Sequence, residues 1–454
     1  MSALLSVSVL LCALAGPTGQ FPNPAAGARS GDIVVQAGKV GTLSADFATL
    51  TVPENWDEPA KLIHLPVVRI RSAAEKVAEP VFYFHGGPGS SNIKLDVSYE
   101  RLLKGHDVVL VGYRGVDGSV SLARPEFNQL LKTVADPVSA EGLRAFGAAA
   151  SRAAEQLKAE GIDVAQYDLD ATIRDIEAAR KALGLDRVST SGTSFGGAVG
   201  YYYSLTFPER VKRSVLIEAA FPWNLGLAEP SGVDTQIRVF GKMWSSDKDI
   251  AAIIRSVLAS LPRRQKVPTP QGEVEVLIDP GTIKLMTFFS LYTAQQRSQT
   301  FDAFVAASEG NYVPLAMADL FWGQVVDLFN WGDMIAKVAS SRSGPARDFE
   351  KEMAPEGSII GSPLSLLGYG MLQHARWPAR PTRIQEPARC SVETVLICGN
   401  EEGAKGLRER LATFDRARVV VLGGLGHMDV YEKADLLQEA FLAGGLAALP
   451  QPKD

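Results

Sequence analysis

The chain has 454 residues, of which 46% are hydrophobic and 21% are charged, and its formal net charge is −5. This composition can fill a hydrophobic core, which excludes an intrinsically disordered protein, and the length fits one domain with a large insertion. The mildly acidic balance argues against a nucleic-acid-binding protein, because such surfaces are usually basic.

The first segment of the chain is apolar and ends in small residues. MSALLSVSVLLCALAG contains Ala13-Leu14-Ala15, an A-x-A cleavage pattern, although no Lys or Arg precedes the apolar run. This pattern is typical of a secretory signal peptide, and the run is too short to span a bilayer comfortably. We therefore expect residues 1–15 to be removed, the mature protein to be secreted or periplasmic, and no stable membrane association. Residues 16–45 are rich in Gly, Pro and Ala, which indicates a linker.

The next part of the chain alternates predicted strands and helices. Two extended apolar runs around a turn predict a hairpin within residues 46–72. Continuous apolar runs predict buried parallel strands at 81–84, 107–112, 187–191, 214–219, 394–398 and 417–422. Helical spacing predicts helices at 139–160, 171–183, 197–207 and 431–443, with Asp170 as the N-cap of the second. This order predicts an α/β fold with a mostly parallel sheet and helices on both faces.

Residues 221–387 interrupt the alternation. They are rich in aromatic residues and have a mostly helical pattern without obvious parallel-strand runs. Because the α/β pattern occupies 46–220 and resumes at 388–448, we predict one α/β core with a large helical insertion. The only cysteines are Cys12, Cys390 and Cys398, which excludes a disulfide framework, and no Cys/His cluster has zinc spacing. No metal or other cofactor is expected, and the sequence leaves open whether the last two cysteines pair.

GTSFGG contains the candidate nucleophile, Ser194. Glycines stand two residues before and two after this serine, the predicted strand ends near Ser191, and the predicted helix begins at Gly197. A nucleophile elbow needs this order, because the strained turn presents the serine and the helix N-terminus favours developing negative charge. The tetrad G-x-S-x-G also occurs by chance, so its place between a strand and a helix is the stronger part of the signal.

HGGPG, residues 85–89, is the candidate oxyanion loop. It directly follows the predicted strand 81–84 and lies upstream of the elbow. An oxyanion hole needs two backbone N–H groups aimed at one oxygen. The residue after the nucleophile, Phe195, would supply one, and Gly86 or Gly87 would supply the other.

His427 is the candidate general base. It follows the last predicted strand by a short Gly loop, in GGLGHMDV, and precedes the final helix. The acid should end the strand before that one, where LICGNEEG offers Glu402 as the preferred residue and Glu401 as the alternative. An acid there would orient the imidazole and stabilise its cationic form. The order Ser, acid, His is that of an α/β-hydrolase.

Together with TVPENWDEP, FHGGPGSSN and DVVLVGYRG, these motifs resemble the proline iminopeptidase and tripeptidyl aminopeptidase branch of the α/β-hydrolases. The resemblance spans residues 46–220 and 388–435. It implies that the insertion 221–387 is a cap over the active site and that the protein hydrolyses short peptides from a free N-terminus. The family usually has Asp where this chain has Gly112, whereas Asp117 here replaces a later glycine.

Three functions fit this sequence. An exported serine aminopeptidase would need an anionic anchor for the substrate ammonium, and the candidates are Glu218, Glu309, Asp319, Asp327 and Asp333. An esterase, lactonase or amidase with the same triad would use the aromatic insertion for an uncharged acyl group. A non-catalytic binding protein on the same fold is opposed by the presence of all four catalytic pieces. The expected partner is a small peptide, ester or amide, and the sequence does not indicate an oligomeric state.

Overall fold

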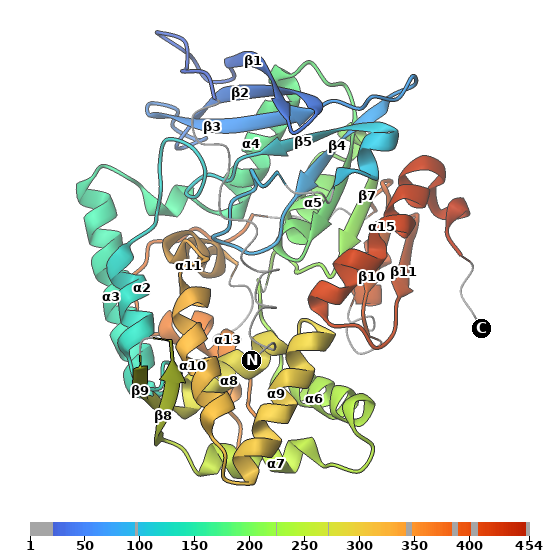
Figure 1. Ribbon diagram of the computed structural model, residues 1–454. Helices are drawn as coiled ribbons and strands as arrows, with labels where there is room; N and C mark the ends of the chain where they lie inside the picture. Colours follow the sequence, from blue (N-terminus) through green and yellow to red (C-terminus); the bar gives the residue numbers. More distant parts are fainter. Residues whose placement is uncertain are drawn as a thin grey trace.

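The computed structural model describes residues 21–95, 99–223, 225–270, 272–341, 347–383, 389–400 and 407–450. The expected signal peptide, residues 1–15, lies outside the described residues. In the part that is described, nine strands form one sheet in the order β1-β2-β3-β5-β4-β6-β7-β10-β11 (Figure 1). Within the same residues, no helix combines the length and the apolar character needed to cross a membrane.

The sheet is antiparallel at one edge and parallel through the rest. Its strands are β1 Ile33–Val40, β2 Leu43–Pro53, β3 Leu62–Ile70, β4 Ala78–Phe84, β5 His106–Val111, β6 Val188–Thr193, β7 Val211–Ile217, β10 Glu393–Cys398 and β11 Ala417–Val421. The strands β1, β2, β3 and β5 pair antiparallel, whereas the six strands from β5 to β11 in the sheet order pair parallel. Every residue of β5, β6 and β10 is buried, as expected for parallel strands covered on both faces.

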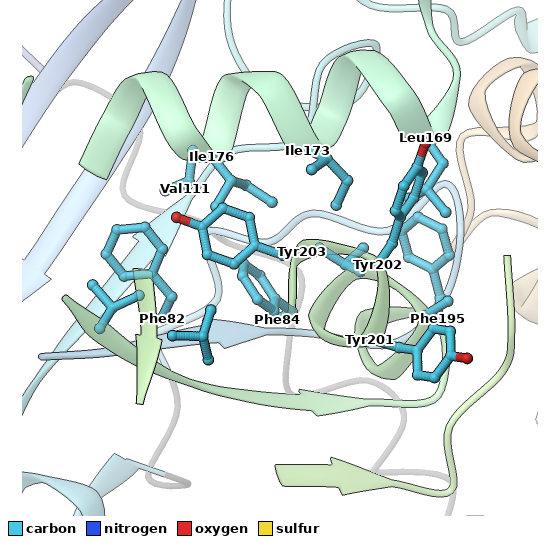
Figure 2. Close-up of a cluster of buried hydrophobic side chains, with 14 of the residues drawn as sticks. Phe82, Phe84, Val111, Leu169, Ile173, Ile176, Phe195, Tyr201, Tyr202 and Tyr203 are labelled. Carbon is cyan, nitrogen blue, oxygen red and sulfur yellow. The ribbon is translucent and has the colours of Figure 1, made fainter. Parts of the chain in front are cut away.

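Helices cover both faces of this sheet. The helices α4 Leu169–Ala182 and α5 Phe195–Thr206 pack on one face, where their side chains meet Phe82 and Phe84 (Figure 2). The helix α15 His427–Gly444 packs on the other face through Val430 and Phe441. The predicted α/β fold with a mostly parallel sheet is therefore confirmed.

Two local predictions are wrong. Residues 33–40 of the expected linker 16–45 form β1, which pairs with β2 at the sheet edge, where Gly38 lies under the Phe47 ring. The sequence did not predict this strand, because the Gly- and Ala-rich composition of the segment indicated a linker. The N-cap of α4 is Asp168, whose Oδ1 accepts from Ala171 N at 2.8 Å, whereas Asp170 accepts hydrogen bonds from Tyr202 Oη and Arg383 N.

The insertion 221–387 is mostly helical, but it also contains an antiparallel hairpin that the sequence did not predict. Its helices are α6 Pro230–Trp244, α7 Ile250–Ala259, α8 Pro280–Ser290, α9 Ala294–Ser308, α10 Val313–Val326, α11 Trp331–Ser340, α12 Phe349–Glu352, α13 Pro363–Ser365 and a π-helical turn, Leu366–Gly370. The hairpin consists of β8 Arg263–Thr269 and β9 Gly272–Ile278. Figure 1 shows α6 to α10 gathered together below the sheet.

The remaining helices belong to the core sequence. The α-helices α2 Pro125–Thr133 and α3 Ala140–Ala159 share a buried cluster with α10 and α11, so they join the core to the insertion. Short 3₁₀ turns are found at Leu102–Lys104, Val164–Gln166, Pro208–Arg210, Leu411–Thr413 and Gly445–Ala448. Cys390 and Cys398 are both buried, and no disulfide joins these two cysteines, a pairing that the sequence left open.

Candidate active site

Ser194 lies on a strained turn between β6 and α5. Its backbone has φ 52° and ψ −116°, a conformation that non-glycine residues rarely adopt. The turn is possible because its glycines carry no Cβ. A Cβ added to Gly192 would lie 2.1 Å from Gly196 O, and one added to Gly196 would lie 2.0 Å from Phe84 O. The sequence therefore places Ser194 at the carboxyl edge of the sheet, against the end of β4.

Two backbone N–H groups beside Ser194 have no hydrogen-bond partner among the described residues. They belong to Phe195, the first residue of α5, and to Gly87 in the loop after β4. Gly86, the alternative to Gly87 in the predicted oxyanion hole, instead donates its N–H to Thr193 Oγ1 at 3.1 Å. A Cβ on Gly86 would lie 2.8 Å from Ser194 Cβ, so this glycine allows the loop to touch the elbow.

A buried network fixes the loop after β4. Asn92 Oδ1 accepts from His85 N at 2.7 Å, and Asn92 Nδ2 donates to Tyr83 O and Val111 O at 3.2 and 2.8 Å. The Asn92 side chain is thus satisfied by three backbone groups, one on β4, one on β5 and one directly after β4. His85 holds the loop in another way, because its Nε2 is hydrogen-bonded to Tyr99 Oη.

Asp117 secures Asn92 in turn. Its Oδ2 accepts from Asn92 N at 3.0 Å and from Tyr113 N at 2.8 Å, and burial raises the pKa of this carboxyl. A Cβ added to Gly112 would lie 2.8 Å from Asp117 Cβ. Gly112 and Asp117 are therefore neighbours in space, and a side chain at Gly112 would require Asp117 and Pro66 to shift.

His427 begins α15 and is held by a carboxylate that the sequence did not assign to it. Glu218 Oε2 lies 3.1 Å from His427 Nδ1, and Glu218 Oε1 accepts from Gly399 N at 2.5 Å. Glu218 directly follows β7 and has φ 49°, a second strained backbone at the same edge of the sheet. Both carboxylate oxygens are used, so the group is fixed in one orientation.

The predicted acids Glu402 and Glu401 lie outside the described residues. The structure instead brings Glu218, considered from the sequence only as an ammonium anchor, to His427. One signal for this was present in the sequence, because SVLIEA places a glutamate at the end of the predicted buried strand 214–219. Carboxyl ends of parallel strands meet at one edge of a sheet, so Glu218 was eligible on the same grounds as Glu402.

Two tyrosines flank the imidazole of His427. The Tyr292 ring, after α8 in the insertion, has its centroid 4.7 Å from that of His427, and the Tyr431 ring of α15 has its centroid at 5.3 Å. Tyr431 Oη is hydrogen-bonded to His427 Nε2 at 2.8 Å. Among the described residues, no direct hydrogen bond joins Ser194 to His427.

The core and the insertion enclose a cavity of 1820 Å³, which is open to Ser194, His427 and Gly87. Ligand pockets usually measure roughly 300–1,000 Å³, so this one exceeds what a single amino acid needs. Its aromatic wall includes Phe289, Tyr292, Phe321, Trp322, Phe329 and Trp331. These rings make the chamber largely apolar, as expected for a site that desolvates its substrate.

Most carboxylates proposed as ammonium anchors are occupied or lie elsewhere. Asp333 is fully buried and forms an ion pair with Lys337 at 2.8 Å, and Asp327 pairs with Lys132. Glu309 and Asp319 are not among the described residues that line the cavity. Three other acids, Asp302 of α9 and Glu432 and Asp435 of α15, line the cavity without an ion pair among the described residues.

Asp333 has a structural role at the junction of the insertion with the site. Its Oδ2 accepts from Gly89 N at 3.1 Å, and Asn330 N donates to Gly89 O at 2.8 Å. Burial raises the pKa of Asp333, whereas the Lys337 ammonium lowers it. The insertion is therefore tied to the loop that carries Gly87. Among the described residues, no group of three or more His, Cys, Asp or Glu side chains is arranged to hold a metal ion.

Comparisons with known proteins agree with this fold. The profile of a family described as alpha/beta hydrolase fold matches residues 79–325, more than half of the chain. Two proteins named tripeptidyl aminopeptidase, from Streptomyces lividans and Streptomyces coelicolor, are each 27% identical over 217 residues. Each alignment covers 45% of this chain and 40% of the relative, so the chain matches less than half the length of these curated relatives.

A likeness to solved structures was also found. A proline iminopeptidase from Mycobacterium smegmatis aligns with 92% of this chain and 100% of its own chain, at 13% identity and a TM-score of 0.35. A score this low supports no argument about the site.

Proposed function

The chain belongs to the alpha/beta hydrolase fold family, and we propose that it is a serine hydrolase that forms an acyl-enzyme on Ser194. The observation that carries this proposal is the placement of Ser194 on a strained elbow beside the N–H groups of Phe195 and Gly87, which have no hydrogen-bond partner in the described part of the chain. The hydrogen-bonded pair formed by His427 and Glu218 lies next to it. A nucleophile, an oxyanion hole, a base and an orienting acid are the parts that acyl transfer needs.

Each group has a defined task in the proposed reaction. Ser194 Oγ attacks the carbonyl carbon of the substrate, and its proton reaches His427 Nε2. The N–H groups of Phe195 and Gly87 bind the oxyanion that forms, and Glu218 stabilises the imidazolium through Nδ1. The base then returns the proton to the leaving group, and water hydrolyses the acyl-enzyme by the same sequence of steps.

We propose short peptides as substrates, cleaved at an amide bond near the free N-terminus. The names of the two Streptomyces relatives support this assignment. The cavity has room for several residues of a peptide. Asp302 and Glu432 on its wall are carboxylates without an ion pair among the described residues, so they are available to bind an ammonium group.

A second candidate substrate is a non-peptide carboxylic ester, lactone or amide. The pairing of Asp333 with Lys337 and of Asp327 with Lys132 favours it, because these acids of the insertion are already neutralised. The aromatic wall of the cavity would then bind an apolar acyl group. The nucleophile, base and oxyanion hole serve both reactions, so the two candidate functions differ only in the substrate that is cleaved.

A rate comparison on the purified mature protein tests these proposals. The panel contains alanyl-, prolyl- and tripeptidyl-arylamides, their N-acetylated forms, and short-chain p-nitrophenyl esters. Ser194→Ala and His427→Ala should lower kcat by about three orders of magnitude or more while the proteins stay folded. Arylamide cleavage that acetylation abolishes supports the aminopeptidase, whereas ester cleavage without arylamide cleavage supports the second candidate. Full activity of Ser194→Ala would refute a serine hydrolase.

Export belongs to the proposal as well. The apolar run with its A-x-A pattern at residues 13–15 supports cleavage after Ala15 and release into the periplasm or the medium. Expression of the full chain in a bacterial host, followed by N-terminal sequencing of the protein in each cell fraction, tests this. A cytoplasmic protein that retains its first residues would contradict export.

A further inference from the structure

Tyr431 occupies the place where a nucleophilic serine usually meets its base. It lies one helical turn after His427 on α15, so its side chain returns over the imidazole. Its Oη is 2.8 Å from His427 Nε2, the nitrogen that must receive the proton of the nucleophile. Ser194 also interacts with this hydroxyl, because its side chain lowers the pKa of Tyr431, and both residues line the same cavity.

The phenol is suited to pass a proton on. A neutral tyrosine hydroxyl can accept one hydrogen bond while it donates another. Burial raises the pKa of Tyr431 well above its ordinary value, so the group is protonated at neutral pH. Because Glu218 accepts from His427 Nδ1–H, the other ring nitrogen is left as an acceptor for the Tyr431 hydroxyl.

We propose that Tyr431 is a further catalytic residue, whose hydroxyl relays the proton between Ser194 and His427. This inference rests on the proposed function, because it needs Ser194 to act as a nucleophile. It adds one group to the four that the sequence indicated, and it explains why the base and the nucleophile are not directly hydrogen-bonded in the described structure.

The relay balances in both directions. As Ser194 Oγ bonds to the carbonyl carbon, its proton moves to Tyr431 Oη, and the Tyr431 proton moves to His427 Nε2. The π electrons of the carbonyl go to its oxygen, which the oxyanion hole binds. In the collapse of the tetrahedral intermediate, the Nε2 proton returns through Tyr431 to the leaving nitrogen or oxygen as the bond from the carbonyl carbon breaks. Tyrosine ends each step as a neutral phenol.

The surrounding contacts hold the Tyr431 and His427 side chains in position. The Tyr431 ring meets the imidazole edge-on, with an angle of 62° between their planes, and Tyr292 packs against the imidazole as well. Glu218 fixes the opposite end through Nδ1. The alternative arrangement is that Tyr431 blocks the base in the resting protein and leaves when substrate binds, in which case its removal would help rather than harm.

Labelling with a fluorophosphonate tests the relay without knowledge of the natural substrate. This probe phosphonylates an activated serine, and the rate depends on removal of the serine proton. Tyr431→Phe should lower the second-order labelling rate by about 100-fold, the lower end of the effect of general acid–base groups. The matched control is Tyr312→Phe, which removes a tyrosine hydroxyl hydrogen-bonded to Ser260 in the insertion and should be labelled at the wild-type rate.

A solvent isotope experiment separates a relay from a packing role. Hydrolysis of a p-nitrophenyl ester is measured in mixtures of H₂O and D₂O. Two protons move together in the relay. A plot of wild-type kcat/KM against the deuterium fraction of the solvent should therefore fall and be curved. In Tyr431→Phe only one proton moves, and the dependence should become linear. A loss of packing alone would lower the rate without changing the shape of this plot.

The labelling results distinguish a failure of the relay from a failure of the proposed function. Wild-type labelling at Ser194 together with slow labelling of Tyr431→Phe supports the relay. Labelling of Tyr431→Phe at the wild-type rate or faster overturns the relay and leaves the serine hydrolase intact. A wild-type protein that is not labelled at Ser194 refutes the proposed function, and the relay with it.

Discussion

Glu218 Oε2 lies 3.1 Å from His427 Nδ1, although 209 residues separate the two in the chain. The other carboxylate oxygen is bound by Gly399 N, so Glu218 cannot turn away from the imidazole without losing a second hydrogen bond. Its backbone φ of 49° is costly for a residue other than glycine, and such strain persists only where the surrounding structure imposes it. These features identify Glu218 as the partner of the candidate base.

Glu218→Gln should lower kcat by roughly 10³-fold or more, the scale of losing a triad carboxylate. If the amide nitrogen faces Nδ1, the imidazole must carry its proton on Nε2, where it can no longer accept one. The lost negative charge also leaves the imidazolium without a partner. The measurement is kcat for a p-nitrophenyl ester, together with a thermal unfolding curve that checks folding.

Glu402→Gln is the matched control for Glu218→Gln. Glu402 is the acid that the sequence favours, and it lies outside the described residues. We expect the Glu402→Gln variant to keep wild-type kcat. If Glu402→Gln were inactive and Glu218→Gln active, the acid inferred from the sequence would be right and the role of Glu218 would be limited to structure.

The sequence predicted the parts of the site that depend on neighbours in the chain. The elbow at Ser194 and the glycines of the loop after β4 are set by local turns, so G-x-S-x-G and HGGPG were informative. The choice between Gly86 and Gly87 was not predictable, because it depends on a hydrogen bond from Gly86 N to Thr193, on another strand. The role of Glu218 likewise depends on which strand ends lie side by side.

The fold was predictable to a similar extent. Continuous apolar runs identified the parallel strands, because burial on both faces leaves little room for polar residues. The edge strand β1 was missed because an edge needs few apolar residues, and Val35 within it is 50% exposed. The hairpin β8–β9 was missed as well, although Val276 and Ile278 alternate with exposed residues there.

Gly87→Ala should reduce activity far more than stability. Gly87 has φ 83°, and an added Cβ would lie 2.8 Å from Ser90 Oγ, so the loop must shift and withdraw the N–H from the oxyanion. Loss of one oxyanion donor lowers kcat by about 10²–10³-fold. The measurement is kcat for a p-nitrophenyl ester beside the free energy of unfolding in urea.

Gly184→Ala separates backbone strain from the effect on the site. Gly184 has φ 66° after α4, with open space around it. Both variants should lose about 1–2 kcal/mol of unfolding free energy, because alanine is strained at positive φ. Only Gly87→Ala should lose kcat. Equal activity of the two variants would show that Gly87 N–H does not bind the oxyanion.

Asp117→Ala should destabilise the loop after β4 that carries Gly87. It removes the acceptor of Asn92 N and Tyr113 N in a buried site, and each unsatisfied N–H costs about 1–3 kcal/mol. We therefore expect a loss of about 3 kcal/mol or more in unfolding free energy, with slower fluorophosphonate labelling of the folded fraction. Asp186→Ala, which removes only an exposed pair with Arg210, should cost less than about 1 kcal/mol. Similar losses in both variants would contradict an anchoring role.

Asp319 should make the stability of the insertion depend on pH. Burial, and then the charge of Asp279, raise the pKa of Asp319 to about 7, and its Oδ2 has no hydrogen-bond partner in the described structure. The pKa of the carboxyl in the unfolded chain is about 3.9, so the folded protein binds the proton more tightly. The contribution to stability is therefore complete below pH 4 and is lost as the pH rises to 7.

Asp319→Asn should remove this dependence, because the amide resembles the protonated carboxyl and has no charge to bury. The variant should melt higher than the wild type at pH 8, and the difference should shrink as the pH falls to 5. Asp136 and Asp279 face the same region, and each side chain repels the other's charge, so part of the slope will remain in the variant. Glu309→Gln, at an exposed position after α9, should show no such trend. A melting difference that is the same at pH 5 and pH 8 would mean that Asp319 is ionised in the folded protein across this range, and that its surroundings stabilise the charge in a way its burial does not suggest.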